Sequence, residues 1–270
     1  MILERLDLAL AGGVEARILF TGRGEPPDSA ANPGSSGSVD RRTYGWANLG
    51  SHVGDDPATV LSARTRLADE LGVDAGSMTF MHPDHGRGVA VVTSPTGVQP
   101  GAELRDVDAL VTATPGVGLV ALAADCVPIV LVEPQARIVA AVHSGWKGVL
   151  VDVAGAALDR IVELGGSVDR LVAWLGPAIC GSCYAVPAQR VEEVSAVSPE
   201  AVAVAADGQP ALDLRAGLTA SLRRRGVADV SLVGSCTAED PGLYSHRRDQ
   251  LTGRQGAAVA MRVTDRRAAA

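Results

Sequence analysis

Short apolar runs rich in β-branched residues recur along most of the chain, and they predict a sheet-rich interior. The predicted strands are 88–93, 109–112, 118–123, 128–133, 137–143, 171–175, 230–233 and 257–263. Several of these runs contain almost no polar residue, which is typical of strands covered on both faces. The alternating segment MILERLDLAL predicts one further strand at the N-terminus.

Four segments place apolar residues three or four positions apart, so they predict helices that each bury one face. These segments are 57–71, 149–164, 187–197 and 214–222. Asp56 stands where it can cap the first helix, and the basic run 223–225 followed by Gly226 is an ordinary ending for the last. The mixture predicts the α/β (α+β) class, with flanking helices around a sheet-rich single domain over residues 1–270.

Two stretches are expected to lie outside this framework. Segment 22–40 is rich in Gly, Pro, Ser and Asn, which predicts a long and mobile surface loop. Residues 265–270 are expected to form a disordered tail.

Composition and charge argue against several classes of protein. Apolar residues make up 47% of the chain but aromatic residues only 3%, so the core must consist mainly of Val, Leu and Ala. The formal charge of −7 argues against broad binding to nucleic acid or to an anionic membrane. No apolar run reaches the roughly 18 residues of a membrane span, and the N-terminus lacks the pattern of a secretory signal. Four cysteines do not form a disulfide framework in a chain of this length, and a reduced, cytoplasmic protein is expected.

Three short segments place His or Cys at the edges of predicted strands, where a sheet can hold side chains while loops leave a site open. They contain His85, Cys126 and His143. Two imidazoles and one thiolate suit Zn²⁺, with the fourth tetrahedral position left for water or substrate. The three residues are about 40 and about 17 positions apart and form no compact motif, so their spacing alone is a weak signal.

The same residues also fit a site without a metal. Cys126 would then be a nucleophile and His143 its general base, as in thiol hydrolases. Asp125, next to Cys126, is a candidate proton shuttle, although its carboxylate could equally fix the turn between two strands. A third alternative is a non-catalytic zinc-binding module whose metal is closed by a fourth protein ligand, for which Cys236 is the candidate.

Basic residues supply candidate phosphate ligands. Arg247, Arg248 and Arg254 lie within eight residues and among hydroxyl side chains, so they could hold phosphate by bidentate hydrogen bonds. The alternative is a solvated loop whose arginines pair with nearby acids. Lys147, which closely follows His143, is a further candidate for orienting phosphate.

Cys180 and Cys183 form a C-x-x-C pair, a spacing that can bind zinc or act in redox chemistry. The chain has no second pair of this kind, and no thioredoxin-like βαβ pattern surrounds this one. Two incidental thiols in a loop are therefore the expectation.

Taken together, six ordered blocks resemble the YfiH-type family, also called the laccase-domain or DUF152 family. The blocks are 48–50 with 52–56, 85–86, 124–128, 143–148, 175–179, and 236–237 with 245–249 and 252–254. The resemblance spans roughly 43–263. It implies a fold related to the catalytic domain of cytotoxic necrotizing factors, the YfiH-like cysteine hydrolase fold. It also implies zinc on His85, Cys126 and His143.

The resemblance implies an activity as well. Members are described as purine nucleoside phosphorylases that cleave adenosine, inosine and methylthioadenosine with phosphate, giving free base and (methylthio)ribose 1-phosphate, and as adenosine deaminases. A nucleoside and phosphate are then the expected partners of a monomeric protein, and Asn48 joins the predicted substrate contacts. Older descriptions call members copper polyphenol oxidases. Five histidines with no H-x-H pair argue against several coppers acting together, although Cu²⁺ can occupy a His₂Cys site.

Three positions depart from the family pattern. Pro83 stands where a glutamine is expected, Ala185 where a glutamate is expected, and His246 where an aromatic residue is usual. The missing polar groups leave the substrate preference and the rate open. His82 is a competing metal ligand, but the His-Gly-x-x-Val context favours His85.

Overall fold

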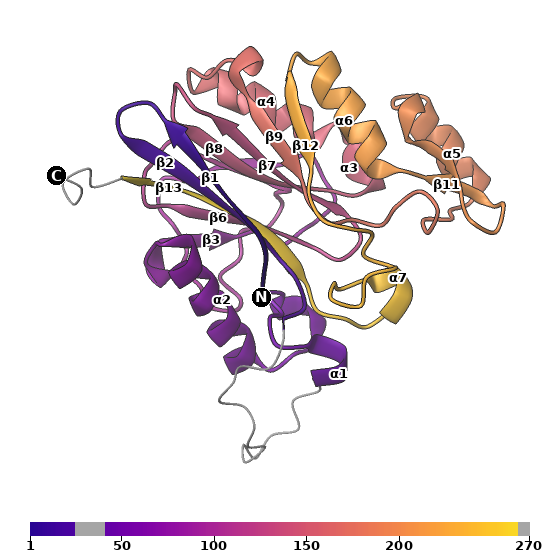
Figure 1. Cartoon of the computed structure of the whole chain (residues 1–270), viewed down its shortest axis with the longest axis horizontal. Helices are drawn as coiled ribbons and strands as arrows, with labels where there is room; N and C mark the ends of the chain where they lie inside the picture. Colours follow the sequence, from indigo (N-terminus) through magenta and orange to yellow (C-terminus); the bar gives the residue numbers. More distant parts are fainter. Residues whose placement is uncertain (25–40, 264–270) are drawn as a thin grey trace.

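Two β-sheets lie face to face, and helices cover the outer face of each (Figure 1). The computed structural model describes residues 1–24 and 41–263. The five-stranded sheet contains, in spatial order, β1 (Ile2–Leu10), β2 (Val14–Thr21), β13 (Gln255–Val263), β6 (Gly118–Ala123) and β3 (Met78–Phe80). The six-stranded sheet contains β12 (Asp229–Leu232), β9 (Val172–Leu175), β7 (Val127–Glu133), β8 (Ile138–Ser144), β5 (Ala109–Thr112) and β4 (Val89–Val91).

The remaining elements are helices and one small antiparallel pair of strands, β10 (Val202–Val204) and β11 (Pro210–Leu212). The α-helices in the described part of the chain are α1 (Arg41–Tyr44), α2 (Pro57–Leu71), α3 (Trp146–Val151), α4 (Val153–Glu163), α5 (Ala188–Ser195), α6 (Leu214–Arg224) and α7 (His246–Asp249). Single 3₁₀ turns occur at 51–53, 75–77, 168–170 and 199–201.

Three apolar clusters fill the spaces between these layers. The cluster between the sheets draws on both of them, for example Leu119 of β6 and Val139 of β8. On the far side of the five-stranded sheet, α2 packs through Leu67 and its neighbours. On the far side of the six-stranded sheet, α3, α4 and α6 pack through residues such as Leu158. Figure 1 shows α2 on one side of the paired sheets and α4 and α6 on the other.

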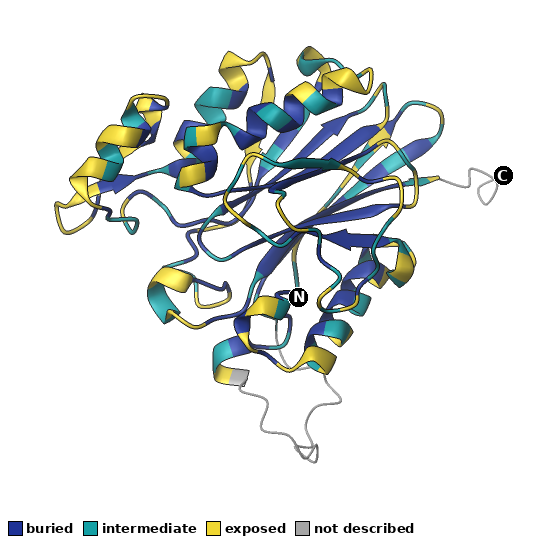
Figure 2. Ribbon diagram, turned by 180° about the vertical axis from the view of Figure 1, so that it is seen from behind, coloured by how far each residue is buried: buried dark blue, intermediate teal, exposed yellow. Residues whose placement is uncertain are grey.

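The central strands are apolar throughout because each is covered on both faces. In β6, Leu119 and Ala121 face the other sheet, whereas Val120 and Leu122 face α2. Every residue of β6, β7 and β8 is buried, as the dark blue strands of Figure 2 show. The interpretation of the wholly apolar runs as doubly covered strands is confirmed, and so is the α/β class with flanking helices.

The helix predicted over 149–164 is in fact two helices. α3 ends before Asp152 and α4 begins after it, because Asp152 has a left-handed backbone with φ of 55°. The Asp152 side chain then caps α4 by accepting a hydrogen bond from the Gly155 N–H at 3.1 Å. The apolar spacing continues through this break, so periodicity could not locate it.

Other differences concern short elements. The predicted N-terminal strand is one half of a hairpin, β1–β2, which turns at Gly12 and Gly13 with φ of 73° and 72°. β3, β10 and β11 have three residues each, too few for a period-two pattern to be recognised. The stretches predicted as a loop (22–40) and a tail (265–270) lie outside the described residues, apart from 22–24. Within the described part, no helix combines the length and apolarity needed to cross a bilayer.

One edge of the six-stranded sheet collects the residues that carry chemistry. The register places Pro128 of β7 opposite His143 of β8, and Ala109 of β5 opposite Val142 of β8. The connection 124–126 crosses here from β6 in one sheet to β7 in the other. The first residues of β5 and β7 and the last of β8 therefore meet at one place.

Candidate metal centre

His85, Cys126 and His143 converge at this edge although they are far apart in the sequence. Their ligand atoms all lie within 4.8 Å of one another. The Cys126 Sγ is 3.8 Å from the His85 Nε2, and the two imidazole rings meet edge to face with centroids 4.9 Å apart. Cys126 is partly exposed and His85 is exposed, whereas His143 is buried. One ion could contact all three donors while remaining open to solvent on one side, as in a catalytic rather than a closed zinc site.

The carboxylate of Asp108 organises this group. Its Oδ1 accepts hydrogen bonds from the His143 Nδ1 at 2.8 Å and from the His85 backbone N–H at 3.0 Å. Its Oδ2 accepts from the Gly86 N–H at 2.6 Å. With Nδ1 of His143 engaged, Nε2 is left to face Cys126, which is the usual arrangement of a carboxylate behind a metal-binding imidazole. The donor set and this support both fit a zinc ion.

Asp108 was not predicted from the sequence. The residue stands just before a buried strand and resembles an ordinary turn carboxylate. Burial raises the pKa of Asp108, but hydrogen bonding and the charge of His143, with the two backbone amides, outweigh burial and lower it below its usual value. The carboxylate therefore stays ionised at neutral pH and keeps accepting from all three donors.

Cys126 and His143 polarise each other. Burial raises the pKa of Cys126, but the positive charge of His143 and the hydrogen bonds from both imidazoles outweigh it and lower the pKa to about 6. Burial lowers the pKa of His143, but the thiolate and Asp108 outweigh it and raise the pKa to about 9. Without a metal the pair is a thiolate and an imidazolium. A metal would find the thiolate already formed and would displace a proton from His143.

Two residues of this group have an unusual backbone, and a nearby glycine leaves room for the ligands. Asp125 and His85 have left-handed backbones, with φ of 89° and 60°, which non-glycine residues rarely adopt. Gly145 leaves the space that the ligands occupy, since a Cβ there would lie 2.7 Å from the Cys126 Sγ and 3.2 Å from the His85 Cδ2. The glycine after His143 and Ser144 is therefore a steric requirement of the site.

The group forms part of the wall of a pocket of about 400 Å³, within the range of small-molecule sites. Besides the three candidate ligands, the lining includes aromatic, basic and small residues: His52, Pro83, Leu122, Ala123, Ala124, Asp125, Trp146, Tyr184, His246, Arg247 and Arg254. Burial, followed by the charge of Arg254, lowers the pKa of His52 to about 4, so this imidazole is neutral. Tyr184 and His52 were not predicted as site residues, since an isolated Tyr or His carries no spacing signal.

Two of the predicted phosphate residues reach this pocket. Arg247 donates from Nη1 to the Ala185 carbonyl at 2.9 Å, and its guanidinium lies 5.0 Å from the centre of the Tyr184 ring. Arg254 donates from Nη1 to the carbonyls of Thr252 and Gly253, both at 2.9 Å. Within the described part of the chain, the Nη2 of neither arginine has a hydrogen-bond partner. Both guanidiniums are thus held at one end and available at the other.

Arg248 and Asn48, two further predicted substrate contacts, make their hydrogen bonds within the protein. Arg248 pairs with Asp249 at 2.8 Å and donates to the carbonyls of Thr237, Asp240 and Leu243. Asn48 is buried, donates to Asp55 at 3.0 Å and accepts from the Arg254 backbone N–H at 2.8 Å. Neither side chain lines the pocket, although Asn48 holds the backbone of Arg254, which does.

Asp125 and Lys147 also differ from the simplest expectation. Asp125 lines the pocket, but its Oδ1 accepts from the Thr237 hydroxyl and its Oδ2 from the Arg247 N–H, both at 2.6 Å. These bonds favour the alternative in which it fixes the turn. Lys147 is exposed beside the Trp146 ring and does not line the pocket. Cys236 lies with Cys180, Cys183 and Glu239 rather than with the three pocket ligands, so it is not their fourth ligand.

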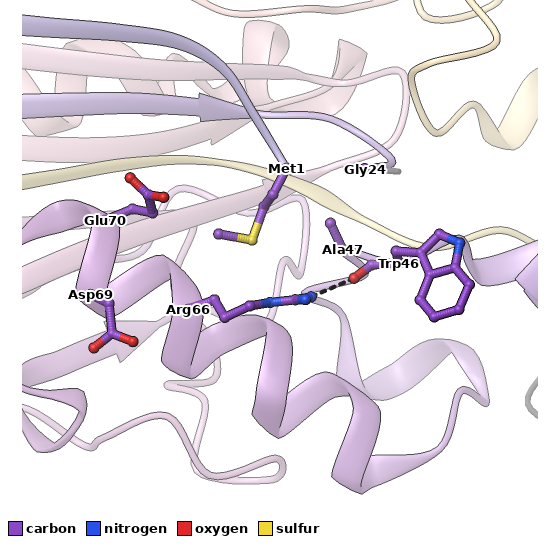
Figure 3. Close-up of a pocket in the computed structure, with 7 residues that line it drawn as sticks. All are labelled: Met1, Gly24, Trp46, Ala47, Arg66, Asp69 and Glu70. Atoms are coloured by element: carbon purple, nitrogen blue, oxygen red, sulfur yellow. Dashed lines mark hydrogen bonds between the residues drawn. The ribbon is translucent and has the colours of Figure 1, made fainter. Parts of the chain in front are cut away.

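A second hollow, against α2, lacks this chemistry (Figure 3). It measures about 500 Å³ and is lined by Met1, Gly24, Trp46, Ala47, Arg66, Asp69 and Glu70. Arg66 spans it and donates to the Trp46 carbonyl at 2.6 Å. None of these described lining residues is a Cys or a His, so the pocket beside β7 and β8 is the candidate site.

The family model described as "Multi-copper polyphenol oxidoreductase laccase" matches residues 32–262. This match covers most of the chain. The chain belongs to this laccase-domain, or YfiH-type, family. The membership of this family expected from the six sequence blocks is confirmed.

Relatives of this laccase-domain protein carry the names of enzymes. A purine nucleoside phosphorylase of Streptomyces coelicolor is 44% identical over 218 residues, covering 81% of this chain and 89% of that protein. An adenosine deaminase from an unknown prokaryotic organism is 37% identical over 259 residues, covering 91% and 93%. Among solved structures, the Bacillus licheniformis hypothetical protein YfiH superposes with a TM-score of 0.77 at 26% identity, covering 92% of each chain. These relatives support an enzyme with a mixed α/β fold.

Replacing Gly145 by Ala tests the packing of the ligand group. The new methyl group would displace Cys126 and His85, so we expect zinc affinity to fall by about tenfold or more. The matched control is Gly76→Ala, where a Cβ meets nothing within 4 Å. Zinc retained after dialysis against a graded chelator series measures the difference. Equal retention by the two variants would show that the ligands do not depend on this close approach.

Proposed function

We propose that this protein is a zinc-dependent purine nucleoside phosphorylase that cleaves adenosine, inosine and methylthioadenosine with phosphate. The observation that carries the proposal is the convergence of His85, Cys126 and His143 on the wall of a pocket that also presents Arg247 and Arg254. A metal-binding group and two guanidiniums in one small pocket suit a reaction in which an anionic nucleophile attacks an electrophilic carbon. The names of relatives add the substrate class.

Phosphorolysis breaks the bond between C1′ of the ribose and the purine nitrogen and forms a bond from C1′ to a phosphate oxygen. The bonding electron pair leaves with the purine, and positive charge develops on the sugar. A zinc ion held by His85, Cys126 and His143 would supply Lewis-acid polarisation in the pocket. The departing purine must also take up a proton, and phosphate loses one as its oxygen bonds to C1′, so the step balances.

The chain's own residues account for binding and orientation. In Arg247 and Arg254, Nη1 donates to backbone carbonyls. The Nη2 groups would then hold phosphate. Trp146 and Tyr184 offer ring surfaces for the base or the sugar. Asp125 positions Arg247 through the backbone, and Asp108 keeps His143 in a single orientation. Arg247, Arg254 and His143 are each held by hydrogen bonds within the protein, which suits the orientation of two reactants.

Adenosine deamination is the second candidate, supported by the relative named as an adenosine deaminase. Water rather than phosphate would then attack C6 of adenine. The H-x-E and P-C-x-x-C signature of nucleobase deaminases is absent from the sequence, and the oxygens of Asp125 are both engaged. The geometry therefore favours phosphorolysis as the main reaction.

Two further alternatives rest on the same residues. A laccase mechanism needs several coppers, whereas the described residues gather one His₂Cys group, which copper could occupy without that chemistry. A thiol hydrolase would use the Cys126 thiolate directly, which the lowered pKa allows. The two arginines that line the pocket have no evident role in that reaction.

Product analysis tests the proposal directly. Wild type and Cys126→Ala, each with its zinc content measured, are given adenosine with and without phosphate, and products are separated by chromatography. We expect adenine and ribose 1-phosphate only with phosphate, and a rate at least about a hundredfold lower in the variant. Far-ultraviolet circular dichroism checks that the variant is folded.

Other product patterns would contradict the proposal. Inosine formed from adenosine regardless of phosphate would make the protein a deaminase. No turnover of adenosine, inosine or methylthioadenosine would overturn the nucleoside assignment and leave a thiol hydrolase or a binding module.

Substitution of Arg247 should impair phosphate binding, whereas substitution of its neighbour Arg248 should mainly lower stability. Arg247→Ala removes a guanidinium from the pocket, and the loss of about 1.5–3 kcal/mol should raise the KM for phosphate roughly ten- to a hundredfold. Arg248→Ala removes the bonds to three carbonyls, so it should lower the melting temperature more than it changes this KM. Steady-state kinetics and thermal melts of both variants distinguish the effects. The same KM for phosphate in Arg247→Ala as in wild type would remove Arg247 from the phosphate site.

A further inference from the structure

A second group of metal-ligand side chains lies outside the pocket. Cys180, Cys183, Cys236 and Glu239 each offer one ligand atom, and these atoms lie within 4.8 Å of one another. None of the four lines the pocket, and all the cysteines carry free thiols. Four Zn–ligand bonds in a tetrahedron, with Zn–S of about 2.3 Å, put sulfurs roughly 3.8 Å apart, so the group needs only a small contraction to close on an ion.

The fold brings the group together by the pairing of two strands. β9 and β12 are parallel neighbours, so the segments that follow them leave the same edge of the sheet. A further parallel bridge joins Ala178 to Cys236, and the Thr237 N–H donates to the Ala178 carbonyl at 3.1 Å. The loop that starts after β9 and the loop that starts after β12 are thus held side by side at the cysteines.

Each loop presents its two ligands from one turn. The Cys183 N–H donates to the Cys180 carbonyl at 3.1 Å, and the Glu239 N–H donates to the Cys236 carbonyl at 3.3 Å. The C-x-x-C pair in the sequence therefore faces a C-x-x-E pair with the same spacing. Two turns of this kind, each giving two ligands, form the usual frame of a structural zinc site. The C-x-x-E pair is not recognisable in the sequence because its second donor, Glu239, is a carboxylate rather than a thiol.

Further contacts suit thiolate ligands. The Cys180 N–H donates to the Cys236 Sγ at 3.3 Å, and such amide donors support metal-bound sulfur. The Cys183 Sγ already lies 3.5 Å from the Glu239 carboxylate. Cys236 is buried while Glu239 is exposed, so the group is anchored at one end and open for ion entry at the other. Sulfur-rich donors with one carboxylate favour Zn²⁺ over magnesium or calcium.

We propose that Cys180, Cys183, Cys236 and Glu239 bind a second, structural zinc ion that joins the two loops behind the pocket wall. Tyr184 follows one pair of ligands, and Thr237, whose hydroxyl binds Asp125, lies within the other. Arg247 and Arg248 bind carbonyls of these same loops, at Ala185 and Thr237. The second zinc thus holds the side of the pocket that carries Tyr184 and Arg247. The proposal is independent of the reaction at the first group.

Zinc counting on single variants tests this site. The protein is purified without exposure to oxidants or chelators, and its zinc is measured by elemental analysis per chain. We expect two ions in wild type, one in Cys126→Ala and one in Cys183→Ser, because each variant loses a different site. A Cys126→Ala protein without zinc, or a Cys183→Ser protein with as much zinc as wild type, would overturn the second site.

A milder variant and a spectrum guard against a misfolded Cys183→Ser protein. Glu239→Gln changes an exposed side chain, and we expect it to release one zinc to a chelator about tenfold faster than wild type. Co²⁺ added to zinc-free Cys126→Ala should give the intense near-ultraviolet absorption of cobalt–thiolate bonds, lost in Cys126→Ala/Cys183→Ser. The absence of that absorption, or mass spectrometry showing a Cys180–Cys183 disulfide in protein kept under reducing conditions, would contradict the proposal.

Discussion

The hydrogen bonds of Asp108 are the interaction on which the rest of the site depends. One carboxylate joins three segments: the loop at His85 and Gly86, the start of β5, and the end of β8 with His143. A displaced group there would leave two backbone amides and an imidazole without their acceptor in a mostly buried place, and a neutral amide would leave one of them so, which is costly. The same contact sets which nitrogen of His143 faces Cys126. Asp108 therefore sets both the positions of the candidate ligands and the nitrogen of His143 that carries the proton.

The two packed sheets explain why such a contact can be held in place. β7 and β8 are buried on both faces, so their ends cannot shift without disturbing two apolar clusters. The strained turn at Asp125 crosses from one sheet to the other and places Cys126 beside His143. Tyr184 lies in a loop whose Ala185 carbonyl binds Arg247, and the proposed second zinc would hold this loop in place as the sheets hold the first group.

Much of this arrangement could be predicted from the sequence, for physical reasons that differ between residues. The buried strands could be predicted because burial on both faces requires unbroken apolar runs, as in β6 and β7. His85, Cys126 and His143 stood out because they lie at the edges of predicted strands. Asp108 could not be found in this way, since its role is a contact with residues more than twenty positions away. The different roles of Arg247 and Arg248 depend on which carbonyls lie within reach, and adjacent residues of one type look the same in a sequence.

The measurement that tests the account most directly is the affinity of Asp108→Asn for the zinc ion proposed to bind at Cys126. The matched control is Asp207→Asn, an exposed carboxylate that also accepts a backbone hydrogen bond, from the Gln209 N–H at 3.1 Å. Competition with a chelator should show affinity about ten- to a hundredfold weaker in Asp108→Asn, because the amide nitrogen cannot accept the bond from Gly86, and little changed in the control. Wild-type affinity in a folded Asp108→Asn protein would contradict the claim that this carboxylate builds the metal centre.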